Sequence, residues 1–146
     1  METDGKKLIA DLLSAMNSHD TNMAVSLWTD DCIYENWANE IVKHGKKELT
    51  TMISAQFADF PDMKFELKSS FAAGDWAGLE YITSGTFANS HEPATPATGK
   101  TFSVHTASII QILKGLPPTG SRFLISRLNA NNLFLAVFGY PDYHQN

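Results

Sequence analysis

The residues that could do chemistry gather on one segment late in the chain. Residues 101–113 are rich in β-branched and aromatic side chains and follow a turn containing Pro96 and Gly99, which predicts one long strand. Side chains of a strand alternate between its faces, so Thr106 and Ser108 share one face and His105 lies on the other. The hydroxyls can hold a ligand oxygen, but the segment offers no Asp or Glu to move a proton. A strand of this length suggests a strongly curved sheet around a pocket.

The composition limits the class of protein. The chain has 146 residues, a formal net charge of −5 and one cysteine, Cys32. The length suits a single domain over residues 1–146 that buries its own core. The negative charge and the absence of a Lys/Arg-rich run argue against nucleic acid or an anionic membrane as partner. With no internal disulfide, no spanning apolar run and no signal-peptide core, we expect a cytoplasmic protein.

Three helices are expected in the first part of the chain. Apolar residues recur every three or four positions over residues 6–17, the pattern of an amphipathic helix. A second helix is predicted over residues 21–28, with Asp20 as its N-cap. After a short strand at residues 32–36, a third helix is predicted over residues 46–58, where the following proline ends it.

Strands make up most of the remainder. Met63, Phe65 and Leu67 alternate with charged residues, which is the period of a half-buried strand. Gly74-Asp75 then predicts a hairpin turn. The expected strands are residues 63–71, 76–87, 101–113 and 121–129, with a loop at 89–99 and a short apolar helix at 131–138. Helices followed by an antiparallel sheet predict an α+β domain.

These pieces, in this order, resemble the SnoaL-like polyketide cyclase family. It belongs to the cystatin-like α+β cone superfamily, which includes nuclear transport factor 2 and ketosteroid isomerase. The matching stretches, within residues 8–139, are Asn17-Ser18-His19-Asp20, Leu27-Trp28-Thr29-Asp30-Asp31, Phe60-Pro61-Asp62, Phe65-Glu66, Gly74-Asp75, Thr83-Ser84-Gly85-Thr86 and Pro96-Ala97-Thr98-Gly99-Lys100. The resemblance implies a cone-shaped, mostly antiparallel sheet wrapped around N-terminal helices, with an internal pocket. It also implies chemistry without metal or cofactor, in which an acidic residue moves a proton next to a carbonyl.

The resemblance supplies the candidate catalytic residues. The cyclase asparagine falls on Tyr34, its glutamine and histidine on Thr106 and Ser108, and its catalytic aspartate on Arg127, so none of the four residue types is retained. The basic aspartate of ketosteroid isomerase falls on Asn36. Limonene epoxide hydrolase, another relative, orients water with a tyrosine and an asparagine spaced like Tyr34 and Asn36. We therefore expect Arg127, Tyr34 and Asn36 to be catalytic, although Arg127 could instead reach the rim or pair with an acid.

The expected ligand-binding residues lie on several elements. The family's site positions assign the face with Thr106 and Ser108 to the cavity, and the inward set of the preceding strand includes Tyr81 and Thr83. The residues predicted to bind ligand are Trp28, Tyr81, Thr106, Ser108 and His91. His91 lies beside Glu92 in a loop that could cover the pocket mouth. His105 is expected on the open side of the sheet, where relatives often dimerise, so a homodimer is expected.

Three functions remain open from the sequence. The first is cofactor-free cyclase, isomerase or dehydratase chemistry on a small apolar or aromatic carbonyl-bearing molecule. Here Tyr34, Asn36, Thr106, Ser108 and Arg127 would hold an oxyanion. The second is a binding protein that kept the cavity but lost proton transfer. The third is a structural domain whose own side chains fill the cavity. No metal is expected, because the histidines lack the spacing of metal ligands.

Overall fold

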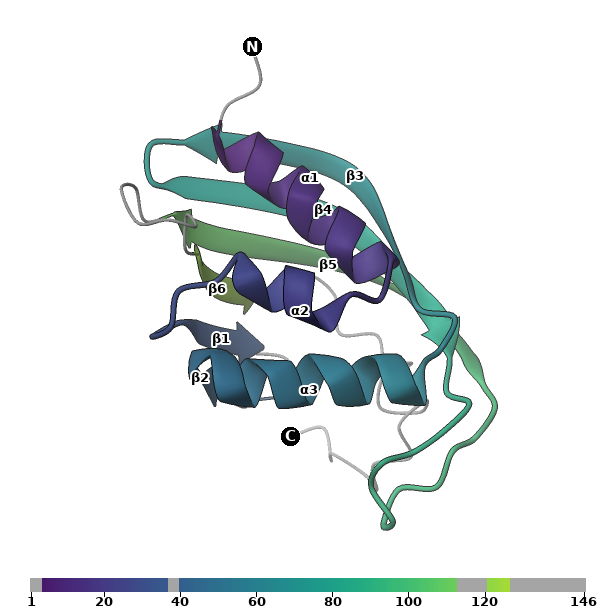
Figure 1. Ribbon diagram of the computed structural model, residues 1–146. Coiled ribbons are helices and arrows are strands. Elements are labelled where there is room, and N and C mark those ends of the chain that lie inside the picture. Colours follow the sequence, from purple (N-terminus) through teal and green to yellow (C-terminus); the bar gives the residue numbers. More distant parts are fainter. Residues whose placement is uncertain (1–3, 37–39, 113–120, 127–146) are drawn as a thin grey trace, which may run out of the picture.

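Three helices cover one face of a single sheet (Figure 1). The computed structural model describes residues 4–36 and 40–112, and the backbone of residues 121–126. The helices are α1 (Asp4–Asn17), α2 (Thr21–Ser26) and α3 (Gly45–Asp59). All three lie close to the predicted ranges, and the side chain of Asp20 caps α2 by accepting from the Met23 N–H. Within this described part, no helix has the length and apolarity to cross a membrane.

The described strands form one sheet of mixed direction. They are β1 (Ile33–Asn36), β2 (Ile41–His44), β3 (Lys64–Ala73), β4 (Trp76–Thr86), β5 (Thr101–Ile112) and β6 (Ser121–Ser126). Their order across the sheet is β2-β1-β6-β5-β4-β3. Neighbours pair antiparallel except β1 and β6, which run parallel. The α+β prediction is confirmed.

Two elements differ from the sequence prediction. β2 was not expected, because its strand of four residues runs directly into α3 and is too short to show a period. It pairs with β1 after a turn in which Glu40 adopts a positive φ of 55°. The predicted helix at 131–138 lies outside the described residues, as does the end of the predicted strand at 121–129.

A β-bulge changes which face β3 presents. The register between β3 and β4 shifts between Leu67 and Ser69. Phe65, before the bulge, is buried in the core, whereas Phe71, after it, is 57% exposed on the opposite face. Simple alternation therefore holds only for the first part of this strand, since an extra residue reverses the side-chain phase.

The end of α1 is attached to the outer edge of β3. Asn17 donates through Nδ2 to the Phe65 carbonyl at 2.9 Å, and its Oδ1 accepts from the Phe65 N–H at 2.8 Å. His19 Nε2 pairs with the Met63 carbonyl at 2.7 Å. These side chains satisfy backbone groups that an edge strand otherwise leaves to solvent. They also fix the helical layer over the sheet, where α1 buries Leu8, Ile9, Leu12 and Leu13.

Removing this attachment should destabilise the whole domain. Asn17→Ala leaves the part-buried Phe65 N–H and carbonyl without a partner, so we expect a loss of about 1–3 kcal/mol in the free energy of unfolding. Urea denaturation followed by circular dichroism measures it. The control is Thr51→Ala, which removes an exposed hydroxyl bonded only to Lys47 in its own helix and should change stability by less than about 0.5 kcal/mol. If the two variants unfolded at the same urea concentration, the bonds between Asn17 and Phe65 would contribute nothing to the free energy of unfolding.

Candidate functional site

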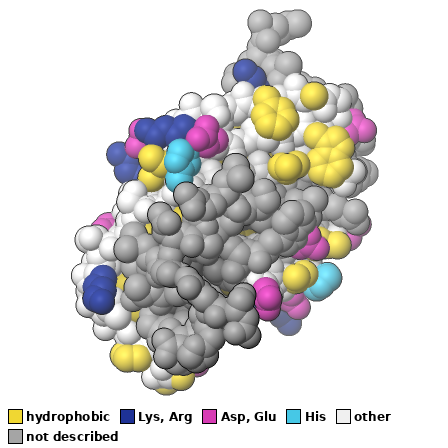
Figure 2. All heavy atoms as spheres, turned by 180° about the vertical axis from the view of Figure 1, so that it is seen from behind, with side chains coloured by type: hydrophobic (Ala, Val, Ile, Leu, Met, Phe, Trp, Pro, Cys, Tyr) yellow, Lys and Arg dark blue, Asp and Glu magenta, His cyan; other side chains and the backbone are white. Residues whose placement is uncertain are grey.

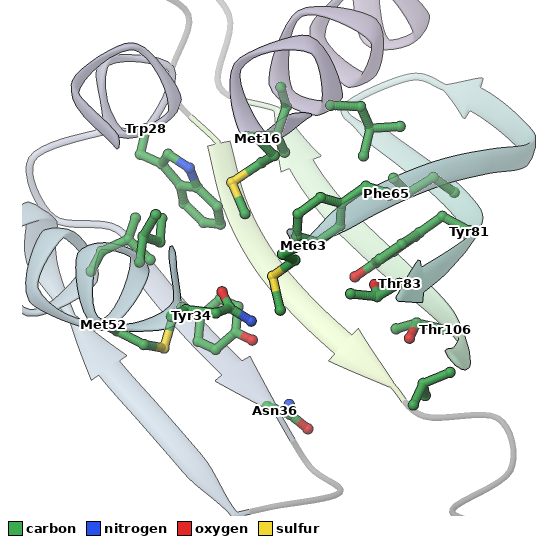
Figure 3. A pocket seen from close by; sticks show the side chains of 17 residues that line it. Met16, Trp28, Tyr34, Asn36, Met52, Met63, Phe65, Tyr81, Thr83 and Thr106 are labelled. Carbon is green, nitrogen blue, oxygen red and sulfur yellow. The ribbon is translucent and has the colours of Figure 1, made fainter. Parts of the chain in front are cut away.

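A pocket of about 120 Å³ lies between the helices and the inner face of the sheet. Its apolar wall comes from helices and strands alike, and Figure 3 shows Trp28, Met16 and Met52 with Met63 and Phe65 around the same space. Three of these side chains are methionines, whose flexible thioethers adapt to ligands of different shape. The enclosure by apolar side chains from several elements is typical of a small-molecule site.

The polar groups of this pocket are all neutral. Hydroxyls and amides line it at Tyr34, Asn36, Gln56, Tyr81, Thr83 and Thr106, and no Asp, Glu, Lys, Arg or His is among the described residues of its wall. Tyr34 and Asn36 lie on one side of the pocket, whereas Tyr81, Thr83 and Thr106 lie on the other (Figure 3). Such groups can donate to or accept from a ligand oxygen but cannot remove a proton from carbon at neutral pH.

The two tyrosines keep their protons in this environment. Burial raises the pKa of Tyr34 well above its ordinary value, the nearby Tyr81 raises it further, and a hydrogen bond with Asn36 offsets part of the rise. Burial likewise raises the pKa of Tyr81, with a partial offset from Ser108. The two phenol oxygens point toward one another across the pocket (Figure 3). Both phenols are therefore neutral donors over the whole physiological range.

Ser108 supports the site from behind rather than lining it. Its side chain is only 1% exposed, and its Oγ donates to the Tyr81 Oη at 3.2 Å. The register pairs Ser108 with Leu79 and places Thr106 directly opposite Tyr81. Ser108 thus orients the Tyr81 hydroxyl, while Thr106 contributes its own side chain to the pocket wall.

The structure brings together most of the residues predicted from the sequence. Tyr34 and Asn36, expected to be catalytic, and Trp28, Tyr81 and Thr106, expected to bind ligand, all line the same pocket. Ser108 touches that group through Tyr81. Arg127 lies outside the described residues, so its role stays a prediction.

His91 lies away from the pocket, at the end of α3. Its Nδ1 is 2.6 Å from Asp59 Oδ2, and its backbone N–H donates to Asp59 Oδ1 at 2.9 Å. The Asp59 backbone carbonyl also accepts from the N–H groups of Ala88 and Asn89. His91 therefore attaches the loop after β4 to the helix instead of lining the pocket, so the ligand-binding role predicted for it has no support from this arrangement. The buried Asp59 carboxylate was missed because a helix-ending Asp usually faces water.

Gln56 is the polar pocket residue that the sequence analysis overlooked. It lies on α3 and lines the pocket beside Met52 and Ile53. Its position, four residues after Met52, puts it on the helix face that carries the apolar side chains. An amide interrupting an apolar helix face is the signal that could have identified it.

The described side chains form no site for a metal ion. In the part of the chain that the structure places, no group of three or more His, Cys, Asp or Glu side chains is arranged to hold one. Cys32 is buried, and burial raises the pKa of its thiol, which disfavours the reactive thiolate.

Solved structures share this fold over nearly the whole chain. One is a putative polyketide cyclase from Pseudomonas putida, with a TM-score of 0.77 and 16% identity, covering 94% of this chain and 99% of that one. Another is AclR, a putative hydroxylase from Streptomyces galilaeus, with a TM-score of 0.72 and 19% identity, covering 97% of this chain and 85% of that one. A third, from Catenulispora acidiphila, is a hypothetical protein with a ketosteroid isomerase-like fold in complex with trimethylamine. Its TM-score is 0.69 at 17% identity, and the match covers 92% of this chain and 94% of that one. At these identities the similarity shows the fold alone.

The sequence itself gives the family. The search of curated proteins finds no match for this chain. The model of the SnoaL-like domain, by contrast, matches residues 9–116, from within α1 to beyond the end of β5, and this range includes every described residue that lines the pocket. The resemblance stated from the sequence is thereby confirmed: the chain belongs to the SnoaL-like domain family.

Proposed function

We propose that this protein binds a small, largely apolar molecule through a carbonyl group in the pocket between its helices and sheet. The observation that carries the proposal is the pair of protonated phenols, the half-buried Tyr34 and the buried Tyr81, which face each other in a largely apolar space. A carbonyl oxygen needs donors and no charge, and these side chains with Asn36 offer such donors. The uncharged wall favours a neutral ligand, because a buried unpaired charge is costly.

The same donors favour a second candidate, cofactor-free proton-transfer chemistry of the cyclase, isomerase or dehydratase type. A developing enolate oxygen accepts stronger hydrogen bonds than the ketone does, so preorganised phenols would stabilise it. The putative cyclase assignment of a structural neighbour agrees with this chemistry. The proton acceptor would lie beyond the described pocket wall, and Arg127 remains a candidate to grip the oxyanion. A non-catalytic binding protein is the alternative.

Binding of acetophenone tests the carbonyl site. Tyr34→Phe removes one donor from the ketone oxygen, so we expect the dissociation constant to rise about fivefold, the equivalent of a hydrogen bond of about 1 kcal/mol. Isothermal titration calorimetry measures it. Because the pKa values of Tyr34 and Tyr81 are both raised, wild-type affinity should stay constant from about pH 6 to about pH 9.

The matched control is a ligand of the same shape without the oxygen. α-Methylstyrene has a CH₂ group where acetophenone has its carbonyl oxygen, so Tyr34→Phe should leave its affinity unchanged. An equal loss for both ligands would mean that the variant altered the shape of the pocket. Failure of the wild type to bind acetophenone would overturn the proposal.

Hydrogen–deuterium exchange separates an enzyme from a binding protein. In D₂O, a catalyst of enolisation incorporates deuterium into the methyl group of acetophenone faster than buffer does, and nuclear magnetic resonance follows the change. We expect Tyr34→Phe to slow this exchange about tenfold or more if the phenol stabilises the enolate. Saturating binding with exchange at the buffer rate would identify a non-catalytic binding protein.

We also propose that two copies of the chain associate through the outer face of the sheet. Phe71, Trp76 and Ile109 are 57%, 40% and 40% exposed, and Figure 2 shows apolar side chains gathered on that face. The register brings Phe71 and Ile109 to either side of Gly78, over which the Phe71 ring lies. An apolar group of this kind favours a protein interface.

A charge in this group should dissociate the proposed dimer. Ile109→Glu places a carboxylate on the outer face, so we expect the sedimentation coefficient of a monomer where the wild type sediments as a dimer. Val42→Glu is the control, because Val42 is 46% exposed on β2, away from the group. A monomeric wild type, or a dimer that survives Ile109→Glu, would contradict this interface.

A further inference from the structure

Thr83 brings a buried hydroxyl to the pocket without a protein partner. Its side chain is 9% exposed and lines the cavity, yet no group among the described residues hydrogen-bonds to its Oγ1. Ser108, another buried hydroxyl of this sheet, does have a partner, Tyr81. Buried hydroxyls are normally hydrogen-bonded, since the alternative costs free energy. Because Thr83 lines the cavity, we infer that a bound ligand supplies the hydrogen-bond partner of its hydroxyl.

One further polar group, Thr106, belongs to the same side of the pocket. Thr106 faces Tyr81 across the β4–β5 pairing, and Thr83 faces Val104. Thr106 and Thr83 thus lie beside one another on the inner face, across the pocket from Tyr34 (Figure 3). The Thr106 hydroxyl likewise hydrogen-bonds to no described residue, and Thr106 lines the cavity.

The volume of the cavity suits a ligand with one ring. At about 120 Å³ it is smaller than most drug-sized ligand sites and close to a cavity that accepts benzene. Polar groups stand on two sides of this space, with apolar side chains such as Met63 between them (Figure 3). A ligand that satisfies both sides therefore carries oxygen at opposite ends of a single ring.

We propose that Thr83, together with Thr106, forms a second hydrogen-bonding subsite for a neutral hydroxyl group of the ligand. This inference rests on the proposed function and takes Tyr34 and Asn36, on the other side of the pocket, as the donors to the carbonyl. A ligand hydroxyl both donates and accepts, as does a threonine hydroxyl, so it uses this subsite better than a second carbonyl does. The ligand class is a neutral hydroxyaryl ketone.

Two ligands of equal size test the subsite. 4-Hydroxyacetophenone and 4-methylacetophenone differ only in a hydroxyl or a methyl group opposite the ketone, and at about pH 6 the phenol is neutral. Calorimetry on the full chain should show that the wild type prefers the hydroxyl ligand about tenfold. Thr83→Val replaces the hydroxyl by a methyl of the same shape. It should reduce the preference to about twofold or less and leave affinity for the methyl ligand equal or higher.

The controls separate this subsite from the carbonyl site and from folding. Thr101→Val, at an exposed β5 position, should keep the tenfold preference. Thr106→Val is measured in parallel and should also reduce it, which keeps the test decisive should Thr83→Val fold poorly by circular dichroism. A wild type that binds both ligands equally, or valine variants that keep the preference, would overturn the subsite while the carbonyl site stands. Failure to bind either ligand would overturn both.

Discussion

Desolvation is the constraint on which the pocket depends. The inner face of the sheet is covered by helices, which exclude water from it. A polar side chain there costs free energy unless it is hydrogen-bonded, and a charged one costs more. The raised pKa values of Tyr34 and Tyr81 follow directly from this burial. A phenol in water is already mostly protonated at neutral pH, but burial keeps the donor fixed and strengthens its hydrogen bonds in the low dielectric. The neutrality of the wall and its capacity to bind oxygen therefore have the same cause.

Two neighbouring sets of side-chain contacts hold this arrangement. Asn17 and His19 bond to the backbone of Phe65 and Met63, and Asp59 at the end of α3 holds the loop through His91. The aromatic rings of Phe60, Phe87 and Phe102 pack beside the second attachment. Between the helices and the sheet, the side chains leave the pocket of about 120 Å³.

The family fixes the scaffold and leaves the chemistry open. Structures of the same fold carry putative assignments as different as a polyketide cyclase and a hydroxylase. By the resemblance, Asn36 and Ser108 stand where relatives have a basic aspartate and a histidine, and Tyr34 and Thr106 stand where the cyclase has amides. Tyr34, Asn36 and Thr106 line one pocket, and Ser108 bonds to it through Tyr81. Replacing a carboxylate by a neutral donor removes proton abstraction but keeps the ability to hold an oxygen. We therefore place ligand binding before catalysis in the proposal.

The sequence by itself determined the helices, the long strands and the inward face of β5, because hydrophobic periodicity reflects burial residue by residue. It also identified Tyr34, Asn36, Tyr81 and Thr106 as pocket residues, partly through the family resemblance. Only the tertiary structure decided that Ser108 stands behind Tyr81, that His91 bonds to Asp59 and that Phe71 lies on the outer face of the sheet. Those outcomes depend on how the strands register, on where the loop after β4 meets the end of α3 and on where β3 bulges. Such long-range geometry joins residues far apart in the chain, and no local pattern of side chains encodes it.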